Sequence, residues 1–515
     1  MPGAAQTQYV RWFAGPPRAL AVGEPTTTTA SLGDAVVCGR PYALDGPVSL
    51  DPDGPVPALQ RALRSLDGKF SLLSAGASTA VLATDALGCG QAYYAQRNGS
   101  VHVSSQLGPL VRFLEGGVTL DPVGTASAVA GSVSVGGRSP YDGVHRLQAG
   151  QFALIDLASG RVQVESYGSV EEIFGVDHEA PGSPGEVMEL IRRAVAREVG
   201  IDALFLTAGK DSRILATALT EEQRDRTLAL TYGGWRSTDR RRAGGVAASV
   251  GLRHRLIGPL LLRPEQYADP IIVRGAGSSG LQVSQHVAGA RAAREHATVV
   301  MTGFLGDILS GLAFRPEPER IDRHVWARHT TRLKRYGGVD PAAVLSDELA
   351  AVREELRREV ERHSDVPPGR TATIVDLIHR QAHYISGTFD MVGQEVEVAT
   401  PFYYRPLVSY FLTRRSEDLA GSKLYNRTLE ETLGRVPLPT DPTASLASAV
   451  AARRGWYGTV NWPAVLGRTR PWLTTLLDCA PDLPLTRLAL DSLDTEAPLP
   501  LALFATPILD TLGDA

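Results

Sequence analysis

Lysine, cysteine and long apolar runs are scarce in this sequence. Its 515 residues include four lysines, which are Lys69, Lys210, Lys334 and Lys423, against a large excess of arginine. Three cysteines, Cys38, Cys89 and Cys479, lie far apart, form no CxxC motif and cannot all pair. This cysteine usage favours a reducing compartment, so we expect the protein to be cytoplasmic.

Two further absences exclude whole classes of partner. No apolar run reaches membrane-spanning length, and the opening MPGAAQTQYVRWFAGP has no basic region followed by a long apolar core. We therefore expect neither a membrane segment nor a signal peptide. The formal net charge of −4 gives no electrostatic basis for binding nucleic acid. The length of the chain predicts two or more domains.

The first third of the sequence predicts layered antiparallel β-sheets with a few helices. Short apolar or alternating runs, among them DAVVCGRPYAL, GKFSLLSAG, TAVLATDALG and GQFALIDLASGRVQVESY, are separated by Gly, Asp and Asn turn signals. Asn98-Gly99 lies between two such runs and predicts a hairpin turn. The segment Asp177–Glu186, rich in Pro, Gly and acidic residues, is the best candidate for a linker between domains.

The pattern changes after this segment. An amphipathic run, VMELIRRAVAREVG, is followed by the apolar strands ALFL, TLALTYG, RHRLIG and ATVVMTG, with helical patterns among them. Alternation of buried strands with helices predicts a parallel α/β sheet. Beyond Pro316 the chain becomes helical and rich in arginine, and it closes on a proline-punctuated tail. We expect one domain over residues 1–178 and a second over residues 187–515.

A short polar loop, Thr207–Ser212, joins the ALFL strand to the next helix. Ligands of open α/β sheets bind at this end of a strand, where backbone N–H groups and a helix N-terminus favour a phosphate. Gly209 would permit close approach of the backbone. Asp211 would repel a bare phosphate, so it indicates a Mg²⁺ ion that the phosphate also contacts. The alternative is an ordinary turn in which Asp or Ser caps the helix.

A second loop of this kind follows the ATVVMTG strand. It reads Thr302-Gly303-Phe304-Leu305-Gly306-Asp307, so a glycine-bearing loop again carries a single acid. Two such loops in one parallel sheet could bring Asp211 and Asp307 to one cation, although a lone Asp307 is also a good helix cap. A third strand ends in Tyr232-Gly233-Gly234 and could border a nucleotide base.

Together these stretches resemble the asparagine synthetase B family. The loop Thr207–Ser212 is similar to the Ser-Gly-Gly-x-Asp-Ser pyrophosphate loop of ATP-pyrophosphatase domains, with Thr207 and Ala208 at its first two positions. TYGGWRSTDRRRAGGVAASVGLRHRLI, TGFLGDILSG and TPFYYRPLVSYFLT resemble other segments of the synthetase domain. ATDALGCGQAYYA, VHVSSQLGPLVRFL and YDGVHRLQAGQFALID resemble the glutaminase-type domain. The resemblance covers most of the chain.

The resemblance implies a fold and a reaction. The fold is α/β, with an N-terminal glutaminase-like (Ntn) domain of layered antiparallel sheets and helices. A C-terminal parallel-sheet synthetase domain, adenine nucleotide α-hydrolase-like, ends in a helical part. The reaction uses ATP and Mg²⁺: a substrate carboxylate attacks the α-phosphate, pyrophosphate leaves, and an amine displaces AMP to form an amide. Asp211 and Asp307 would bind the metal. Pyrophosphate and adenosine would contact Leu206, Thr207, Ala208, Gly209, Lys210, Asp211, Ser212, Tyr232, Gly233 and Gly303.

Three departures from the family bear on the chemistry. A glutamine-hydrolysing member needs a cysteine after the initiator methionine, but this sequence has Pro2, so we expect an inert glutaminase-like domain and an amine from elsewhere. The position that often holds a base is Phe304. Where the family carries a catalytic lysine further along, this sequence has Arg453 and Arg454, so either an arginine or Lys210 substitutes or the chemistry is altered.

Other titratable residues are further candidates. Glu397 is our candidate for the missing base, with Glu395 and Asp390 as alternatives, although each could instead belong to a polar helix face. His379 and His383 stand four residues apart and could form a metal pair on a helix, but we expect an ordinary surface or pocket role.

Relatives without glutaminase activity include lasso peptide cyclases and β-lactam synthetases, and the opening YVRWFAGPP and the chain length are more similar to the former. We therefore expect an ATP-dependent ligase that closes an intramolecular amide in natural-product biosynthesis, with a peptide macrolactam ahead of a β-lactam. Its partners would be a peptide or small-molecule carboxylate and, for a peptide, a leader protease and a precursor-recognition protein. The alternatives are intermolecular amidation of a small acid and a non-catalytic scaffold or binding homologue.

Overall fold

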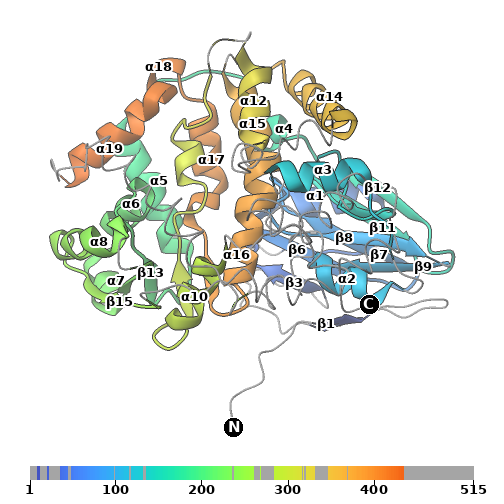
Figure 1. The fold of residues 1–515 in the computed structure, drawn as a ribbon, viewed down its shortest axis with the longest axis horizontal. Coiled ribbons are helices and arrows are strands. Elements are labelled where there is room, and N and C mark those ends of the chain that lie inside the picture. Colours follow the sequence, from blue (N-terminus) through green and yellow to red (C-terminus); the bar gives the residue numbers. More distant parts are fainter. Residues whose placement is uncertain are drawn as a thin grey trace, which may run out of the picture.

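The computed structural model describes most of the chain up to residue 433. The described residues are 9–11, 20–22, 35–44, 48–97, 99–114, 118–131, 135–234, 237–259, 267, 283–315, 317, 320–330, 346–367 and 369–433. Pro2, Arg453, Arg454, Cys479 and the predicted tail lie outside them. Figure 1 shows a β-rich part in blue and cyan beside a part built from green to orange elements. Within the described residues, no helix is both long and apolar enough to cross a bilayer.

An antiparallel sheet of five strands forms one layer of the β-rich part, in the order β12-β11-β7-β6-β3. Its strands are β3 (Val36–Gly39), β6 (Phe70–Ala75), β7 (Thr79–Thr84), β11 (Gln151–Asp156) and β12 (Val162–Ser166). Val81 and Phe152 belong to one buried cluster, whereas the next residues, Leu82 and Ala153, belong to another. The two faces of the sheet therefore carry separate cores, because successive side chains of a strand point to opposite faces.

A three-stranded antiparallel sheet, in the order β10-β8-β9, forms a second layer. Its strands are β8 (Tyr93–Arg97), β9 (Ser100–Ser104) and β10 (Val144–Arg146). Val103 of β9 packs in the same cluster as Leu82 of the larger sheet. Arg97 faces Ser100 across a turn in which Gly99 has φ +74°. The layered antiparallel sheets and the hairpin that the sequence predicts are confirmed.

Short strand pairs and helices complete this part. The pairs join β1 (Tyr9–Arg11) to β2 (Leu20–Val22) and β4 (Tyr42–Ala43) to β5 (Leu66–Asp67). The helices are α1 (Val56–Arg64), α2 (Leu107–Phe113), α3 (Pro122–Gly131) and α4 (Val170–Phe174).

A parallel sheet follows, in the order β15-β14-β13-β16-β17. Its strands are β13 (Ala203–Phe205), β14 (Leu228–Thr231), β15 (Arg253–Leu256), β16 (Val299–Met301) and β17 (Glu397–Ala399). Every pairing in it is parallel. The predicted parallel sheet is therefore confirmed, while the edge strand β17 comes from a segment in which the sequence pattern predicts no strand.

Helices surround the parallel sheet and extend beyond it. Those around the sheet are α5 (Pro184–Arg197), α6 (Lys210–Ala218), α7 (Glu221–Arg226), α8 (Thr238–Ser249), α10 (Ser284–Ala293) and α11 (Gly306–Leu309). The later ones are α12 (Ile321–His329), α14 (Ser346–Arg362), α15 (Arg370–Val375), the π-helix η5 (Asp376–Ile385), α16 (Ser386–Val392), η6 (Pro401–Tyr403), α17 (Arg405–Leu412), α18 (Ser416–Leu419), η7 (Ala420–Ser422) and α19 (Lys423–Leu433). The helical character predicted beyond Pro316 is confirmed as far as residue 433.

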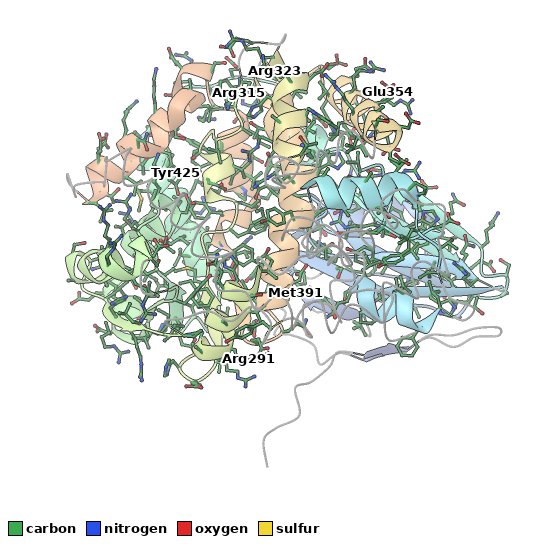
Figure 2. All side chains as sticks on the ribbon, in the orientation of Figure 1. Arg291, Arg315, Arg323, Glu354, Met391 and Tyr425 are labelled. Atoms are coloured by element: carbon green, nitrogen blue, oxygen red, sulfur yellow. The ribbon has the colours of Figure 1, made fainter. Side chains whose placement is uncertain are left out.

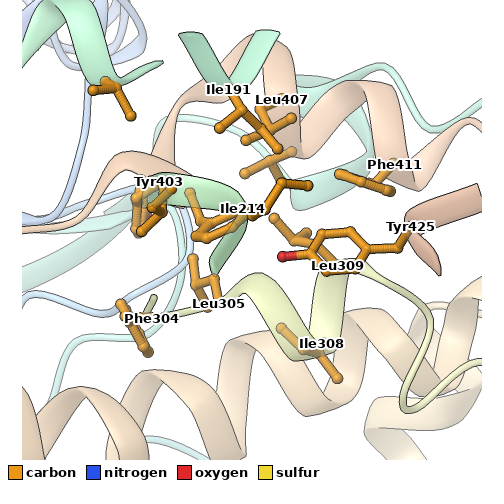
Figure 3. Close-up of a cluster of buried hydrophobic side chains, with 14 of the residues drawn as sticks. Ile191, Ile214, Phe304, Leu305, Ile308, Leu309, Tyr403, Leu407, Phe411 and Tyr425 are labelled. Carbon is orange, nitrogen blue, oxygen red and sulfur yellow. The ribbon is translucent and has the colours of Figure 1, made fainter. Parts of the chain in front are cut away.

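The largest buried cluster joins the two parts of the molecule. Leu87 and Cys89, which follow β7, pack in the same cluster as Ile191 of α5 and Ile214 of α6. Figure 3 shows the middle of this cluster, with Tyr403 beside Ile214. The Tyr403 hydroxyl also accepts a hydrogen bond of 2.9 Å from the Leu87 backbone N–H. A shared core of this kind fixes the β-rich part against the parallel sheet.

Candidate active site

Two aspartates meet where neighbouring strands of the parallel sheet end. Asp211 lies in the first turn of α6, which follows β13, and Asp307 lies in the first turn of α11, which follows β16. Strands β13 and β16 pair directly and in parallel. The two loops therefore leave the same edge of the sheet side by side. The structure brings together the two acids that the sequence offers as metal ligands.

Glycines of the second loop make room for the Asp211 side chain. A Cβ atom on Gly303 would lie 2.8 Å from Asp211 Cβ, and one on Gly306 would lie 2.6 Å from Asp211 Cγ. Between them Leu305 has φ +74°, an uncommon conformation for a residue with a side chain. The Asp211 carboxyl group is thus packed against the backbone of the loop that carries Asp307.

The loop between β13 and α6 is tied by its own hydroxyl groups. The Thr207 N–H donates to Ser212 Oγ at 3.0 Å, and the two hydroxyl oxygens are 2.9 Å apart. The Gly209 N–H donates to Thr207 Oγ1 at 3.0 Å. The Ala208 N–H donates to the Asp239 carboxylate, which reaches over from α8, at 2.8 Å. Gly209 is the N-cap of α6 and has no side chain to accept from the first turn, so those N–H groups remain available to an anion.

Loss of surrounding water and the negative charge of another acid raise the pKa of each aspartate. The pKa of Asp211 is raised to about 7, first by burial and then by the negative charge of Asp307. Asp307 is open to solvent on one side. Even so, loss of surrounding water and the negative charge of Asp376 raise its pKa. A cation between Asp211 and Asp307 would offset this repulsion.

Two cationic side chains lie on the same turn of α6. Lys210 is half-buried, and burial lowers its pKa while the neighbouring Asp211 charge acts in the opposite sense. Arg213 is buried and its Nε donates to the Gly209 carbonyl oxygen at 3.1 Å. Burial lowers the pKa of Arg213 as well. Positive charge is therefore held beside the loop and partly out of water.

The residues that the sequence offers for contact with the nucleoside lie at the ends of β13 and of its neighbour β14. Leu206 is fully buried, and its N–H donates to the Leu230 carbonyl oxygen at 2.9 Å. The Tyr232 hydroxyl lies 2.8 Å from His286 Nδ1 on α10, so this ring is held from behind. Gly233 has φ +132°, a conformation that disfavours any side chain. The structure thus puts Leu206, Tyr232 and Gly233 at one edge of the sheet, next to the Thr207–Ser212 loop.

The three candidate bases lie elsewhere, around one cavity. The cavity measures about 420 Å³ and lies between β3 and the segment from α16 to β17. Glu397 ion-pairs with Arg40 at 2.6 Å, Asp390 ion-pairs with Lys69, and Glu395 ion-pairs with Arg294 at 2.8 Å. All six of these side chains line the cavity, as does Cys38.

Glu397 lies at the amino end of its strand. It pairs with Val299, the first residue of β16, whereas the loop carrying Asp307 leaves the opposite, carboxyl end of β16. The structure therefore brings Glu397 to Arg40 and to the cavity, not to the turn that holds Asp211. Phe389, which lines the cavity, packs on Phe304 of the Asp307 loop with ring centroids 5.1 Å apart. An aromatic pair thus links the wall of the cavity to the loop that carries Asp307.

The paired histidines lie in the π-helix η5. The His379 and His383 ring centroids are 6.1 Å apart. His383 contacts the Arg146 guanidinium, and burial lowers its pKa well below the usual range. His379 Nε2 lies 3.5 Å from a Glu359 oxygen. Among the described residues, no three or more His, Cys, Asp or Glu side chains form a group that could hold a metal ion. The ordinary pocket role expected for these histidines fits their burial.

Two side chains of the site carry no signal in the sequence. Tyr425 of α19 donates a hydrogen bond of 2.8 Å to Asp211 Oδ1 from 214 positions away. Asp239 approaches the loop from α8. Tyr425 belongs to none of the quoted motifs, and the stretch TYGGWRSTDRRRAGGVAASVGLRHRLI, which includes Asp239, does not indicate this contact.

The aspartates fit a magnesium ion better than a metal with an all-protein ligand set. Mg²⁺ is commonly bound by one or two carboxylates together with substrate phosphates and water. Asp211 and Asp307 supply two carboxylates whose repulsion raises the pKa of Asp211. The N-terminus of α6 beside them suits the phosphate. The donor set is thus suited to a cation that arrives with a phosphate-bearing ligand.

Comparisons with known proteins give limited information. No protein-family model and no curated protein matches the chain. Among solved structures, the allosteric regulatory enzyme of purine biosynthesis aligns at 10% identity and TM-score 0.16, over 40% of this chain and 51% of that one. Glutamine phosphoribosylpyrophosphate amidotransferase from B. subtilis, complexed with ADP and GMP, aligns at 12% identity and TM-score 0.15, over 48% and 50%. The chain therefore spans about half the length of these structures, and TM-scores of this size establish no common fold.

Proposed function

We propose that this protein is an ATP-dependent, AMP-forming amide ligase. The observation that supports the proposal is the meeting of Asp211 and Asp307 just beyond two adjoining parallel strands, beside an uncapped helix N-terminus. This arrangement offers acids for a cation and N–H donors for phosphate in one place. The resemblance to the asparagine synthetase B family supplies the reaction.

In the proposed reaction, a substrate carboxylate oxygen attacks the α-phosphorus of ATP and the bond to pyrophosphate breaks. The first turn of α6 and the hydroxyls of Thr207 and Ser212 would bind the pyrophosphate oxygens. Asp211 and Asp307 would hold Mg²⁺, which neutralises charge on the phosphate oxygens when it is bound. Lys210 would stabilise negative charge that develops on the phosphorus oxygens.

In the second step an amine nitrogen attacks the acyl carbon, AMP leaves, and the amine loses a proton. We propose that the cavity lined by Asp390, Glu395 and Glu397 admits the amine and that one of these acids accepts the proton. Each of these acids already forms an ion pair with a lysine or an arginine. The acid that accepts the proton must therefore release this partner before it can contact the amine. The finer proposal is intramolecular closure of a peptide macrolactam, with a β-lactam or an intermolecular amide as the alternative product.

Pyrophosphate release tests the ligase. Purified full-length protein is incubated with ATP, Mg²⁺ and a panel of carboxylates that includes amine-bearing peptides, and pyrophosphate and AMP are measured. We expect both products to form together with a particular carboxylate, and to be lost in Asp211→Asn. If ATP binds but no member of the panel yields pyrophosphate or AMP, the non-catalytic binding homologue is the better interpretation. Hydrolysis of ATP to ADP would contradict both the AMP-forming ligase and the non-catalytic binding homologue.

A further inference from the structure

The hydroxyl group of Tyr425 meets the carboxyl group of Asp211 inside the protein. It donates a hydrogen bond of 2.8 Å to Asp211 Oδ1. Tyr425 is fully buried on α19, and in Figure 3 its side chain points toward Ile214 and Leu309 with the hydroxyl oxygen leading. The same residue is labelled on the ribbon in Figure 2, where α19 approaches α6. A helix from the end of the described chain thus contributes a donor to the first loop of the parallel sheet.

The remaining surroundings of Asp211 leave its carboxyl group little freedom. The backbone at Gly303 lies against its Cβ atom, and the backbone at Gly306 lies against its Cγ and Oδ1 atoms. Tyr425 then holds Oδ1 by a directed hydrogen bond from another side. A carboxylate that is packed on one side and hydrogen-bonded on the other keeps one orientation. Tyr425 supplies the directed part of that constraint.

The Tyr425 ring is held independently of its hydroxyl. Its centroid lies 6.4 Å from that of Phe402 and 6.1 Å from that of Phe411. Leu424 and Leu429 of the same helix are buried in the same cluster. Removal of the hydroxyl oxygen alone therefore leaves the packing of α19 in place and removes one contact, the hydrogen bond to Asp211.

We propose that Tyr425 is a positioning residue for the cation site: its hydroxyl fixes the Asp211 carboxylate so that this group and Asp307 bind one divalent cation together. The inference rests on the proposed function, which assigns Asp211 and Asp307 to the binding of a divalent cation. Partners that orient a metal-binding side chain typically change metal affinity about 10- to 100-fold when they are removed. Tyr425 reaches no nucleotide directly in this role, because it acts through Asp211.

The test is the affinity of the full-length protein for Mn²⁺, measured by electron paramagnetic resonance in the presence of ATP. We expect Tyr425→Phe to weaken Mn²⁺ binding about 10- to 100-fold. Tyr410→Phe is the matched control, because the Tyr410 hydroxyl donates to Glu186 at the same distance of 2.8 Å on the outside of the molecule. The control should bind Mn²⁺ as the wild type does. The melting temperatures of both variants are recorded alongside.

A second comparison keeps the inference falsifiable if Tyr425→Phe loses stability. In the Asp211→Ala background, which removes the acceptor of the Tyr425 hydrogen bond, a positioning role predicts that Tyr425→Phe causes no further loss of Mn²⁺ affinity, whereas general damage to the fold adds to the loss. Unchanged Mn²⁺ affinity in Tyr425→Phe, with loss in Asp211→Asn, would overturn the positioning role and leave the proposed function intact. If the wild type binds no Mn²⁺ with ATP, the cation site and the positioning role fall together.

Discussion

The backbone of Gly306 lies against the Asp211 side chain: a Cβ atom at position 306 would lie only 2.6 Å from Asp211 Cγ. The contact joins the two loops that carry the acids of the site. Because the neighbour is a half-buried carboxyl group that the Tyr425 hydroxyl already holds, even a methyl group must displace it. Gly306 is therefore required for the position of the Asp211 side chain in the first turn of α6.

Gly306→Ala should weaken Mn²⁺ binding in the presence of ATP at least tenfold, since the added methyl group displaces the Asp211 carboxylate. Overpacking of this kind costs about 1–3 kcal/mol of the free energy of unfolding. Calorimetry and Mn²⁺ titration measure the two effects. Gly245→Ala is the control, because a Cβ atom there meets nothing within 4 Å.

The control should instead become more stable by up to about 1 kcal/mol, as glycine in a helix is replaced by alanine. A Gly306→Ala variant that binds Mn²⁺ as tightly as this control would show that the contact does not set the geometry of the site.

Asp211→Asn should raise the stability of the cation-free protein at alkaline pH. The pKa of Asp211 is raised from 3.8 to about 7 in the folded protein. The native state therefore binds this proton more tightly than the unfolded state does, and its stability falls as the pH rises through that window. The asparagine side chain stays neutral and can still accept the Tyr425 hydrogen bond. The melting temperature of the variant should exceed that of the wild type at pH values above about 7, and the difference should vanish near pH 3.8, the ordinary pKa of an aspartate.

Thermal unfolding in the presence of a chelator, across acid and alkaline buffers, measures this difference. With ATP present, addition of Mg²⁺ at alkaline pH should stabilise the wild type and have little effect on Asp211→Asn. An equal response of both proteins to Mg²⁺ would contradict the assignment of Asp211 to the cation.

Much of this site follows from local sequence patterns, and the reason is topological. A strand, a glycine-bearing loop and a helix occur twice, around Asp211 and around Asp307, and parallel neighbours bring equivalent loops to the same edge. The strand pattern also predicts the two sheet types, because period-2 alternation and fully buried runs differ in the sequence itself. These features depend on residues close together in the chain.

The contacts that no pattern predicts are those between distant residues. Tyr425 and Asp211 are 214 positions apart, and Arg40 and Glu397 are 357 positions apart. Glu397 begins an edge strand, β17, of only three residues, too short to show a period. The sequence therefore offers Glu397 as a base near the aspartates without indicating that Arg40, from the other part of the molecule, contacts it. Such pairings are fixed by packing of the whole chain.

Glu397→Gln should lower the stability of the protein. Arg40 is buried and contacts both Glu397, at 2.6 Å, and Glu198, at 3.3 Å. Removal of one charge leaves the guanidinium with one acid, and because Glu397 is partly exposed we expect a cost of about 1–3 kcal/mol, below the range for a fully buried pair. Chemical denaturation measures it. Glu361→Gln on the exposed face of α14 is the control and should change stability by less than about 0.5 kcal/mol.

The same variant separates a structural role from a catalytic one. A double-mutant cycle with Arg40→Met reports the coupling between the two side chains. Strong coupling in stability with pyrophosphate release intact would assign Glu397 to the contact between the two parts of the molecule. Loss of amide formation at unchanged stability would instead support its role as the base.

Lys210→Met should lower the rate of pyrophosphate release about 10²- to 10³-fold, the loss typical of removing one group that stabilises transition-state charge. The melting temperature should change little. Burial lowers the pKa of this half-buried lysine, which means that its positive charge contributes no net stability to the folded protein. Lys423→Met, at the exposed start of α19, controls for the loss of one positive charge. Lys210→Arg should restore part of the rate, since it returns the charge with a different shape. If Lys210→Met raises KM for ATP and leaves kcat unchanged, the lysine binds ATP and its transition state equally, and another cation must stabilise the phosphorus oxygens.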